Sequence, residues 1–327
     1  MNELALAAFA AATDVHASDR ESRTHRFASF ESQFDRAAYL DELRQKGLRF
    51  VGRSDPAFPP RLHAIHDPPP GLFLRGNAEP TLLAQLAVAV VGARACSDYG
   101  AHVARGLARE LARAGIVVVS GLARGVDGWA HRGALDAEGF TVAVLGCGID
   151  RDYPGAHAPL AQQISREGLI VSEYPPGVAP APWRFPARNR IVAGLAAATI
   201  VIEARERSGA LITADLALEE GRDVLAVPGE ITSALSDGTN GLLRLGATPV
   251  TCAEDVLEVL GVEPTPRPDD EPPEGVAGLA LAAIDGGART ADEVALATRL
   301  APAEVAAALT ELELAGMVTA AAGHYRR

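Results

Sequence analysis

The sequence predicts an α/β protein built on a doubly wound parallel sheet, with a small helical region before it and a winged helix after it. From Ala87 to about Gly261, short apolar runs alternate with amphipathic segments. The apolar runs are rich in Val and Ile and show no polar alternation, which is typical of strands buried on both faces. Such an alternation places helices on both sides of one parallel sheet.

The composition limits the classes of protein that fit. A chain of 327 residues holds roughly two or three domains. Its net charge of −12 argues against a wholly basic nucleic-acid binder, but a local positive groove remains possible. Lys46 is the only lysine among 30 basic residues, so phosphate contacts have to come from arginine, which suits bidentate geometry.

The three cysteines are scattered through the chain as Cys96, Cys147 and Cys252. They form neither a disulfide framework nor a metal-binding spacing, which favours a reducing cytoplasm. The N-terminus shows no signal peptide, and no apolar run approaches the roughly 20 residues that span a bilayer. We therefore expect a cytoplasmic protein with no membrane and no metal.

Residues 1–47 predict weak helices, the clearest being Arg36–Lys46, and indicate no function. The next stretch, Phe50–Gly76, contains six prolines. Proline fixes φ and lacks a backbone donor, so this stretch is expected to be an irregular or edge-strand connector.

The doubly wound domain is expected over residues 48–262. Its predicted strands are Ala87–Val91, Ile116–Val119, Thr141–Leu145, Leu169–Val171, Thr199–Ile202 and Val224–Val227. Its predicted helices are Tyr99–Ala114, Val126–Glu138, Ala156–Glu167, one that begins at Pro186, and Ile212–Glu220.

The C-terminal part begins with a linker over residues 263–275, which holds five prolines and five acidic residues. Residues 276–327 then predict a small unit, with helices opening near Thr290 and Pro302. Met317–Thr319 and His324–Arg326 are expected to pair as a wing. Three helices and two strands would form a winged helix.

The stretch Trp183–Gly194 is a basic and aromatic island in an acidic chain. No Asp or Glu lies between Glu173 and Glu203. With Pro186 as the first helical residue, the island's polar residues fall in the first turn, where free backbone N–H groups favour phosphate. These residues are Arg188, Asn189 and Arg190, with Arg184, Trp183 and Phe185 just before them. A helix start with solvated arginines is an equally weighted alternative.

Ligands of doubly wound sheets bind beyond the carboxyl ends of the strands, so the turns there are candidate sites. Arginine and serine side chains and glycine backbones in these turns can approach phosphate. The candidates are Gly92 and Arg94 in the first turn, Ser120, Gly121 and Arg124 in the second, and Ser208 and Gly209 at a later helix start. Each turn taken alone also fits a tight connection that needs glycine for its geometry.

The sequence offers no convincing set of catalytic residues. His131 is expected to be packed or on the surface, and Asp127 to cap a helix. Asp150 and Asp152 lack the further ligands of a metal site. The turn Gly146–Arg151 begins like a dinucleotide fingerprint but ends in arginine. The sequence therefore predicts no catalytic residue, no metal and no cofactor.

Six motifs occur in order: VGARACSDYG from Val91, SGLARGVDGWAHRGAL from Ser120, VAVLGCGIDRDYP from Val142, SEYPPG from Ser172, FPARNRIVAGLA from Phe185 and SGALITADLALEEGRDVLAVPG from Ser208. Together they resemble the DNA-processing protein A (DprA/Smf) family over roughly Phe50 to Leu260. The tail resembles the family's winged helix (DML1-like). Residues 1–47 resemble its N-terminal helical (SAM-like) domain only loosely.

This resemblance implies an extended Rossmann domain that binds single-stranded DNA without hydrolysing it. It also implies protection of incoming strands in natural transformation, loading of a RecA-type recombinase, and a homodimer formed through the Rossmann domain. Matched by motif, the DNA contacts would be Arg94, Ser120, Gly121, Arg188, Asn189 and Arg190, with Phe185 stacking on a base.

Two departures and two alternatives accompany the resemblance. Contacts made by lysine in the family must be made by arginine here. The helix after Pro302 contains three glutamates and no Lys or Arg, which opposes duplex binding. A nucleotide hydrolase of the lysine-decarboxylase-related type would need a PGGxGTxxE-like turn, which Pro228-Gly229-Glu230 only begins. A nicotinamide oxidoreductase would need the absent fingerprint.

Overall fold

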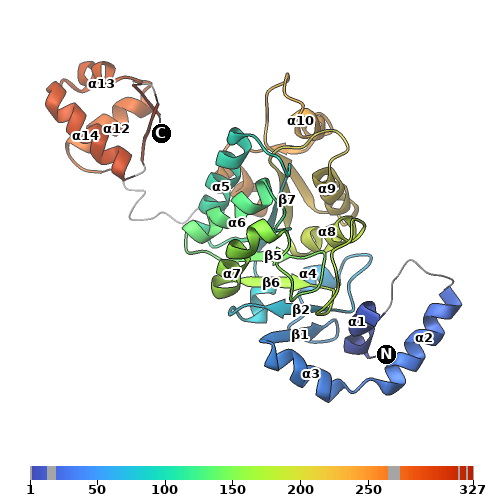
Figure 1. The fold of residues 1–327 in the computed structure, drawn as a ribbon. Coiled ribbons are helices and arrows are strands. Elements are labelled where there is room, and N and C mark those ends of the chain that lie inside the picture. Colours follow the sequence, from blue (N-terminus) through green and yellow to red (C-terminus); the bar gives the residue numbers. More distant parts are fainter. Residues whose placement is uncertain (1, 13–19, 264–272, 316, 322, 327) are drawn as a thin grey trace. The chain divides into compact units, whose positions relative to one another are not determined.

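The computed structural model describes residues 2–12, 20–263, 273–315, 317–321 and 323–326 (Figure 1). In these residues the longest sheet has nine strands in the order β1-β2-β6-β5-β4-β3-β7-β8-β9. The strands are β1 (Leu48–Gly52), β2 (Gly71–Arg75), β3 (Ala87–Val91), β4 (Val117–Ser120), β5 (Thr141–Val144), β6 (Leu169–Ser172), β7 (Ala198–Val201), β8 (Asp223–Ala226) and β9 (Thr248–Pro249).

The strands from β6 to β9 pair in parallel, as predicted. β1 and β2 pair antiparallel with each other, and β2 pairs antiparallel with β6. The prediction of a connector over Phe50–Gly76 was therefore incomplete. β1 is an edge strand, but β2 lies inside the sheet, and the six prolines occupy the segment between the two strands.

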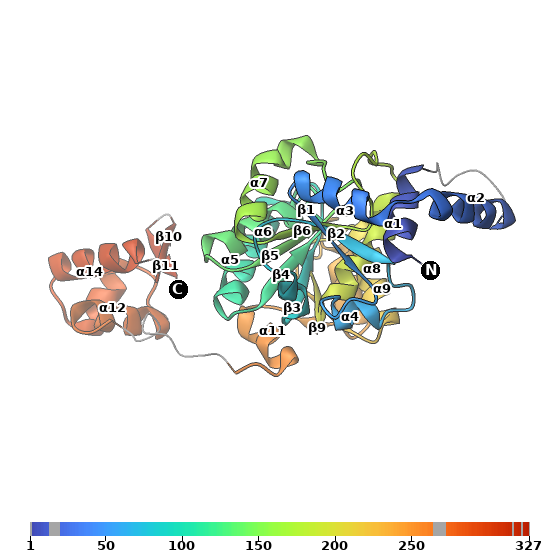
Figure 2. The same cartoon turned by 90° about the horizontal axis from the view of Figure 1, so that it is seen from below.

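Helices cover both faces of the sheet (Figures 1 and 2). One face carries α5 (Asp98–Arg113), α6 (Val126–Asp136), α7 (Ala158–Glu167) and α11 (Ala253–Leu260), and the other carries α4 (Pro60–His63), α8 (Arg184–Leu195), α9 (Gly209–Glu219) and α10 (Asp237–Arg244). Successive side chains of β3 alternate between the layers. Val88 and Val90 pack in the cluster of α5 and α6, whereas Ala87 and Ala89 pack in that of α8 and α9.

Three helices precede the sheet: α1 (Glu3–Ala12), α2 (Arg20–Gln33) and α3 (Arg36–Gln45). The Asp35 side chain caps α3 by accepting from the backbone N–H groups of Ala37 and Ala38. Leu4 and Leu43 pack with Phe73 of β2, so α1 and α3 share a core with the sheet.

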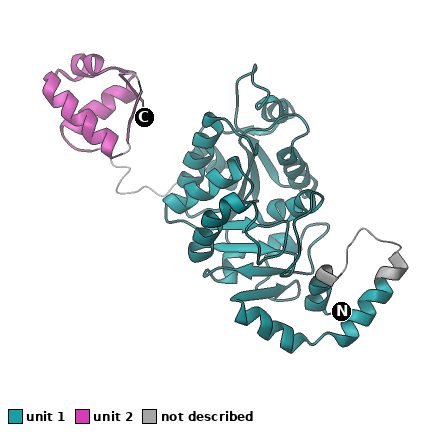
Figure 3. Cartoon of the chain, in the orientation of Figure 1, with its two compact units in different colours: residues 1–264 teal, residues 265–327 magenta. Residues whose placement is uncertain are grey.

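The chain divides into two compact units, Met1–Pro264 and Thr265–Arg327 (Figure 3). The smaller unit has its own core and contains α12 (Val276–Asp285), α13 (Ala291–Thr298), α14 (Pro302–Leu314), β10 (Thr319–Ala321) and β11 (His324–Arg326). A Thr290–Glu293 capping box begins α13. The wing pairs Thr319 with Arg326, so its first strand starts two residues later than predicted. Most of the expected linker, residues 264–272, lies outside the described part of the chain.

Candidate nucleic-acid interface

The order of the strands reverses at β3, which lies between β4 and β7. In an open α/β sheet this switch point leaves a crevice beyond the carboxyl ends of the strands. A hollow of about 70 Å³ lies there. It is bordered by the turns after β3 and β4 and by the N-terminal parts of α8 and α9. The lining residues are Val91, Arg94, Gly121, Ala123, Asp127, Phe185, Pro186, Arg188, Asn189, Val192, Gly209, Ala210 and Thr213.

Arg94 and Phe185 meet at this hollow. The guanidinium carbon of exposed Arg94 lies 5.6 Å from the centroid of the Phe185 ring, in a cation–π contact. Phe185 is half-buried, because its ring lies close to the backbone of Gly146 and stacks on Tyr153 with centroids 5.3 Å apart. The hollow thus has a positive charge beside two aromatic rings.

Helix α8 begins at Arg184 and not at Pro186, which corrects the predicted start. Pro186 is the third helical residue, where its missing N–H costs no hydrogen bond. Arg188 and Arg190 consequently lie beyond the first turn. The three arginines of the island are not free for phosphate in this structure, as their contacts show.

Arg188 is 4% exposed and donates to the backbone oxygens of Gly121, at 2.7 Å, and Val144. The carboxylate of Asp127 faces it and accepts from the N–H groups of Gly121 and Ala123. Burial raises the pKa of Asp127 and lowers that of Arg188, while each charge opposes the shift of the other. Arg188 therefore holds the turn after β4 in place from beneath the hollow.

Gly121 is required by this arrangement, because a Cβ there would lie 2.5 Å from an Arg188 nitrogen. Gly92 is required for a similar reason, since its Cβ would lie 2.6 Å from a Val126 methyl. Both glycines therefore serve close packing within the chain. Packing alone thus explains Gly121, and the approach of a phosphate to its backbone stays a prediction.

Arg184 and Arg190 also form contacts within the protein. Arg184 is buried, donates to the oxygen of Ala179 and lies over the rings of Tyr174 and Trp183. Arg190 forms a two-pronged ion pair with Glu173 and a further contact with Asp67. The island contains no acidic residue in sequence, but in the folded chain Glu173 and Asp67 contact Arg190.

The remaining predicted residues divide into buried and exposed ones. Ser120 is fully buried and donates to the oxygen of Val90 at 2.7 Å, so it supports the sheet edge in place of the expected phosphate contact. Asn189 accepts from Arg188 and donates to the oxygen of Gly209, which ties α8 to the start of α9. Arg124 is exposed and has no polar partner among the described residues.

Ser208 and Gly209 begin α9, as predicted, and Gly209 borders the hollow. The Ser208 hydroxyl oxygen is buried without a hydrogen-bond partner in the described part of the chain. Arg205 and Arg207, in the same turn after β7, are exposed and have no described polar partner. Sequence reasoning missed these two arginines, although their position after a predicted strand was a usable signal.

The N-terminus of α5 is already occupied by an anion from the chain itself. The carboxylate of Glu203, which is 4% exposed, accepts from the backbone N–H of Ser97 at 2.9 Å and from its hydroxyl. Dinucleotide enzymes hold pyrophosphate at the N-terminus of the corresponding helix. This arrangement therefore opposes binding of a dinucleotide at that position.

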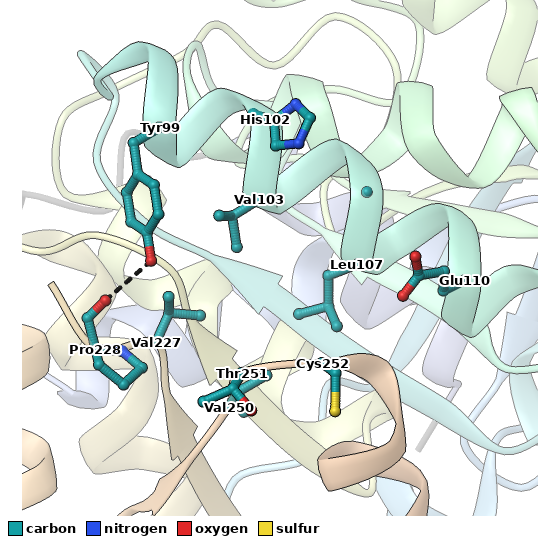
Figure 4. A pocket seen from close by; sticks show the side chains of 11 residues that line it. Tyr99, His102, Val103, Leu107, Glu110, Val227, Pro228, Val250, Thr251 and Cys252 are labelled. Atoms are coloured by element: carbon teal, nitrogen blue, oxygen red, sulfur yellow. Dashed lines mark hydrogen bonds between the residues drawn. The ribbon is translucent and has the colours of Figure 1, made fainter. Parts of the chain in front are cut away.

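A second hollow, of about 330 Å³, lies between α5 and the segment that leads into α11 (Figure 4). Tyr99, Val103 and Leu107 line it from α5, and the Tyr99 hydroxyl donates to the oxygen of Pro228. Glu110 borders it, and none of its lining residues is a lysine or an arginine. It is therefore a poor site for an anion.

Within the described residues, no cluster of His, Cys, Asp and Glu could hold a metal ion. Over the same residues, no helix is both long and apolar enough to cross a membrane. His131 is fully buried. Of the two positions predicted for it, packed or on the surface, the packed one is confirmed.

The DNA recombination-mediator protein A family model matches residues 49–261, and the DprA winged helix domain model matches residues 263–324. DNA processing protein DprA of Streptococcus pneumoniae is 49% identical over 224 residues, which cover 67% of this chain and 77% of that protein. Protein Smf of Escherichia coli is 38% identical over 316 residues, which cover 93% and 84%.

Two solved structures are similar as well. DNA processing protein A from S. pneumoniae superposes with a TM-score of 0.66 and 45% identity, covering 71% of this chain and 80% of that one. DNA processing protein A from Helicobacter pylori, described for its mode of binding single-stranded DNA, gives a TM-score of 0.59 and 33% identity, covering 65% and 95%. With the motifs and the sheet, these matches show that the chain belongs to the DNA recombination-mediator protein A (DprA/Smf) family.

Proposed function

We propose that this protein binds single-stranded DNA at the carboxyl edge of its sheet and catalyses no reaction on it. The observation that carries the proposal is the contact of Arg94 with Phe185 at the switch point. An exposed guanidinium binds a phosphate, and a stack of aromatic rings beside it accepts a base, so the arrangement matches one nucleotide of a single strand. The H. pylori relative, described for its single-stranded DNA binding mode, supports this choice of ligand.

Exposed arginines extend the positive charge on both sides of the pair. Arg124 lies in the turn after β4, and Arg205 and Arg207 lie in the turn after β7. The start of α9, at Ser208 and Gly209, adds free backbone N–H groups that favour phosphate. Arg188, Asn189 and Arg190 act in this proposal mainly as supports, with Arg188 adding positive charge that Asp127 partly offsets.

The experiment is a comparison of single-stranded and double-stranded DNA of the same sequence, titrated at two salt concentrations. We expect preference for the single strand and an affinity that falls with salt, with a log–log slope of about −0.7 per neutralised phosphate. Equal affinity for both forms would contradict the proposal. Incubation with nucleoside monophosphates and with NAD tests the enzyme alternatives, and turnover of either would favour them.

The cellular role follows from this activity. We propose that the protein acts in the cytoplasm, protects incoming single strands in natural transformation and helps to load a RecA-type recombinase. The winged helix is expected to serve protein contacts, because α14 carries Glu304, Glu311 and Glu313 and no Lys or Arg. A recombinase assay on DNA coated with single-strand binding protein tests the loading role.

We further propose a homodimer formed through the larger unit. Ile231 is 92% exposed, and Leu245, at the end of α10, is 87% exposed. Burying these side chains between two copies of the chain would remove apolar surface from water, which favours association. Light scattering of Leu245→Glu against the unmodified protein tests the dimer, with a shift towards the monomer expected.

A further inference from the structure

We infer that Tyr153, at the outer end of the stack that it forms with Phe185, is the platform on which one base of the strand stacks beyond the end of β5. The inference rests on the proposed function and concerns a residue outside the contacts matched by motif. The ligand at this position is an unpaired nucleobase of any type, because every base has an aromatic face.

The first support is the geometry of the two rings. Tyr153 stacks on Phe185 with centroids 5.3 Å apart and an interplanar angle of 21°. Phe185 is the inner ring, since Arg94 lies over it and a Cβ on Gly146 would come within 2.9 Å of it. Tyr153 is the outer ring and is 42% exposed. A base that joins this stack therefore meets Tyr153.

The second support is the way in which the loop is anchored. Asp152 accepts from Arg75 at 2.5 Å, and Asp150 accepts from the backbone N–H of Gly177 at 2.9 Å. Arg151 donates to the oxygen of Gly177 at 3.0 Å. These contacts fix the three residues before Tyr153 to neighbouring segments. Little conformational entropy is therefore lost when a base stacks on the Tyr153 ring.

The third support is the absence of another role for the Tyr153 hydroxyl. The described residues include no hydrogen-bond partner for it, and Tyr153 belongs to none of the four hydrophobic cores. A single exposed aromatic residue is common on protein surfaces. Here, however, the ring continues a stack that starts at the cation of the proposed site.

The test compares Tyr153→Ala with Phe140→Ala by fluorescence anisotropy of labelled oligothymidylate. Phe140 is 47% exposed and directly precedes β5, so it lies at the opposite edge of the sheet from Tyr153. We expect Tyr153→Ala to weaken binding by about 5- to 150-fold, the effect of losing one base stack, and Phe140→Ala to match the unmodified protein. Tyr153→Phe restores the binding, because it keeps the ring.

The salt dependence separates stacking from charge. Tyr153 contacts no phosphate in this inference, so Tyr153→Ala keeps the salt slope of the unmodified protein, whereas Arg94→Ala lowers it. Tyr153→Leu preserves an apolar contact with Phe185 but removes the ring, and it is expected to bind as weakly as Tyr153→Ala. Full affinity of Tyr153→Leu would overturn the inference and leave only a packing role.

The remaining outcomes distinguish this inference from the function on which it rests. If Arg94→Ala weakens binding and Tyr153→Ala does not, Tyr153 is not a platform, and the proposed function stands. If the unmodified protein fails to bind oligothymidylate at low salt, both are wrong. Melting curves of all variants identify any loss of affinity that comes from unfolding.

Discussion

Arg190 and Glu173 form a two-pronged ion pair, with Nη1 2.8 Å from Oε1 and Nη2 2.7 Å from Oε2. Their side chains are only 18% and 13% exposed. The positive charge of Arg190 is therefore neutralised inside the protein, although the sequence suggested that it binds phosphate. Its role is to fix α8 against the segment that follows β6.

Arg190→Ala is accordingly predicted to lower stability, because it leaves the Glu173 carboxylate without its partner. We expect a loss of about 3 kcal/mol in the free energy of unfolding, measured with urea. Arg205→Ala is the matched control, since that arginine is exposed without a described polar partner, and it should change stability by less than about 0.5 kcal/mol. An Arg190→Ala protein that keeps its stability but no longer binds DNA would show that Arg190 contacts the DNA.

Arg94→Ala and Arg124→Ala are predicted to weaken binding of all single-stranded sequences alike, because both side chains would contact phosphate. Each should also make the log–log salt slope shallower by about 0.7. Arg113 lies in the last turn of α5, at the opposite edge of the sheet, so Arg113→Ala is the control. Binding of the Arg94→Ala, Arg124→Ala double variant at the unmodified level in moderate salt would rule out this site.

Phe185→Ala is predicted to reduce both DNA affinity and stability. The ring is half-buried between Gly146 and Tyr153, so its removal also takes away packing contacts. A fully buried phenylalanine costs about 3–5 kcal/mol on truncation, and a half-buried one about half of that. Urea unfolding and anisotropy measured on the same variant separate the two effects. A loss of the full core value with unchanged binding would show that Phe185 only packs.

His131 is predicted to make stability depend on pH. It is fully buried, and burial lowers its pKa to about 3, against about 6.5 in an unfolded chain. Between these values the unfolded state binds one more proton, so stability falls as pH falls below about 6.5. From pH 7 to pH 5 this group alone removes about 2 kcal/mol.

The matched variant is His131→Asn, which keeps a donor for the Thr141 hydroxyl that His131 Nδ1 contacts at 2.7 Å. Urea unfolding at both pH values should show a loss smaller by about 2 kcal/mol in the variant. Identical losses in the two proteins would mean that His131 is not buried in its neutral form.

The smaller unit is predicted not to bind duplex DNA. Its α14 would be the helix in the major groove, and it carries three glutamates without a basic residue. A chain that ends at Pro264 should keep the single-strand affinity of the full protein within about twofold. Residues 265–327, which have a core of their own, should give no salt-sensitive shift of a labelled duplex. Micromolar binding there would overturn the charge argument.

The central strands were predictable because each is a short apolar run that is bounded by polar turns. Ala87–Val91 matches β3 at both ends for this reason. β2 was missed because its apolar residues follow a cluster of prolines, which suggested a connector. Nothing in the local pattern shows that a strand after such a cluster joins the interior of a sheet.

The site was predictable only in part, for a different reason. The turns were located correctly, since strand ends set them. Whether each arginine is free to bind DNA depends on partners that are distant in sequence. Arg188 donates a hydrogen bond to Gly121, 67 residues away, and Arg190 donates one to Asp67, 123 residues away. A count of neighbouring charges cannot reveal such pairs. Arg94 and Arg124 remain as exposed cations, and the sequence had ranked them no higher than the buried ones.

The Glu203 carboxylate at the start of α5 has a consequence for how the protein would behave in a cell. Because it is covalently part of the chain, its effective concentration beside the Ser97 N–H group stays constant, and any soluble anion has to compete with it there. Soluble dinucleotides would therefore bind weakly at this helix end, which in dinucleotide enzymes holds the pyrophosphate.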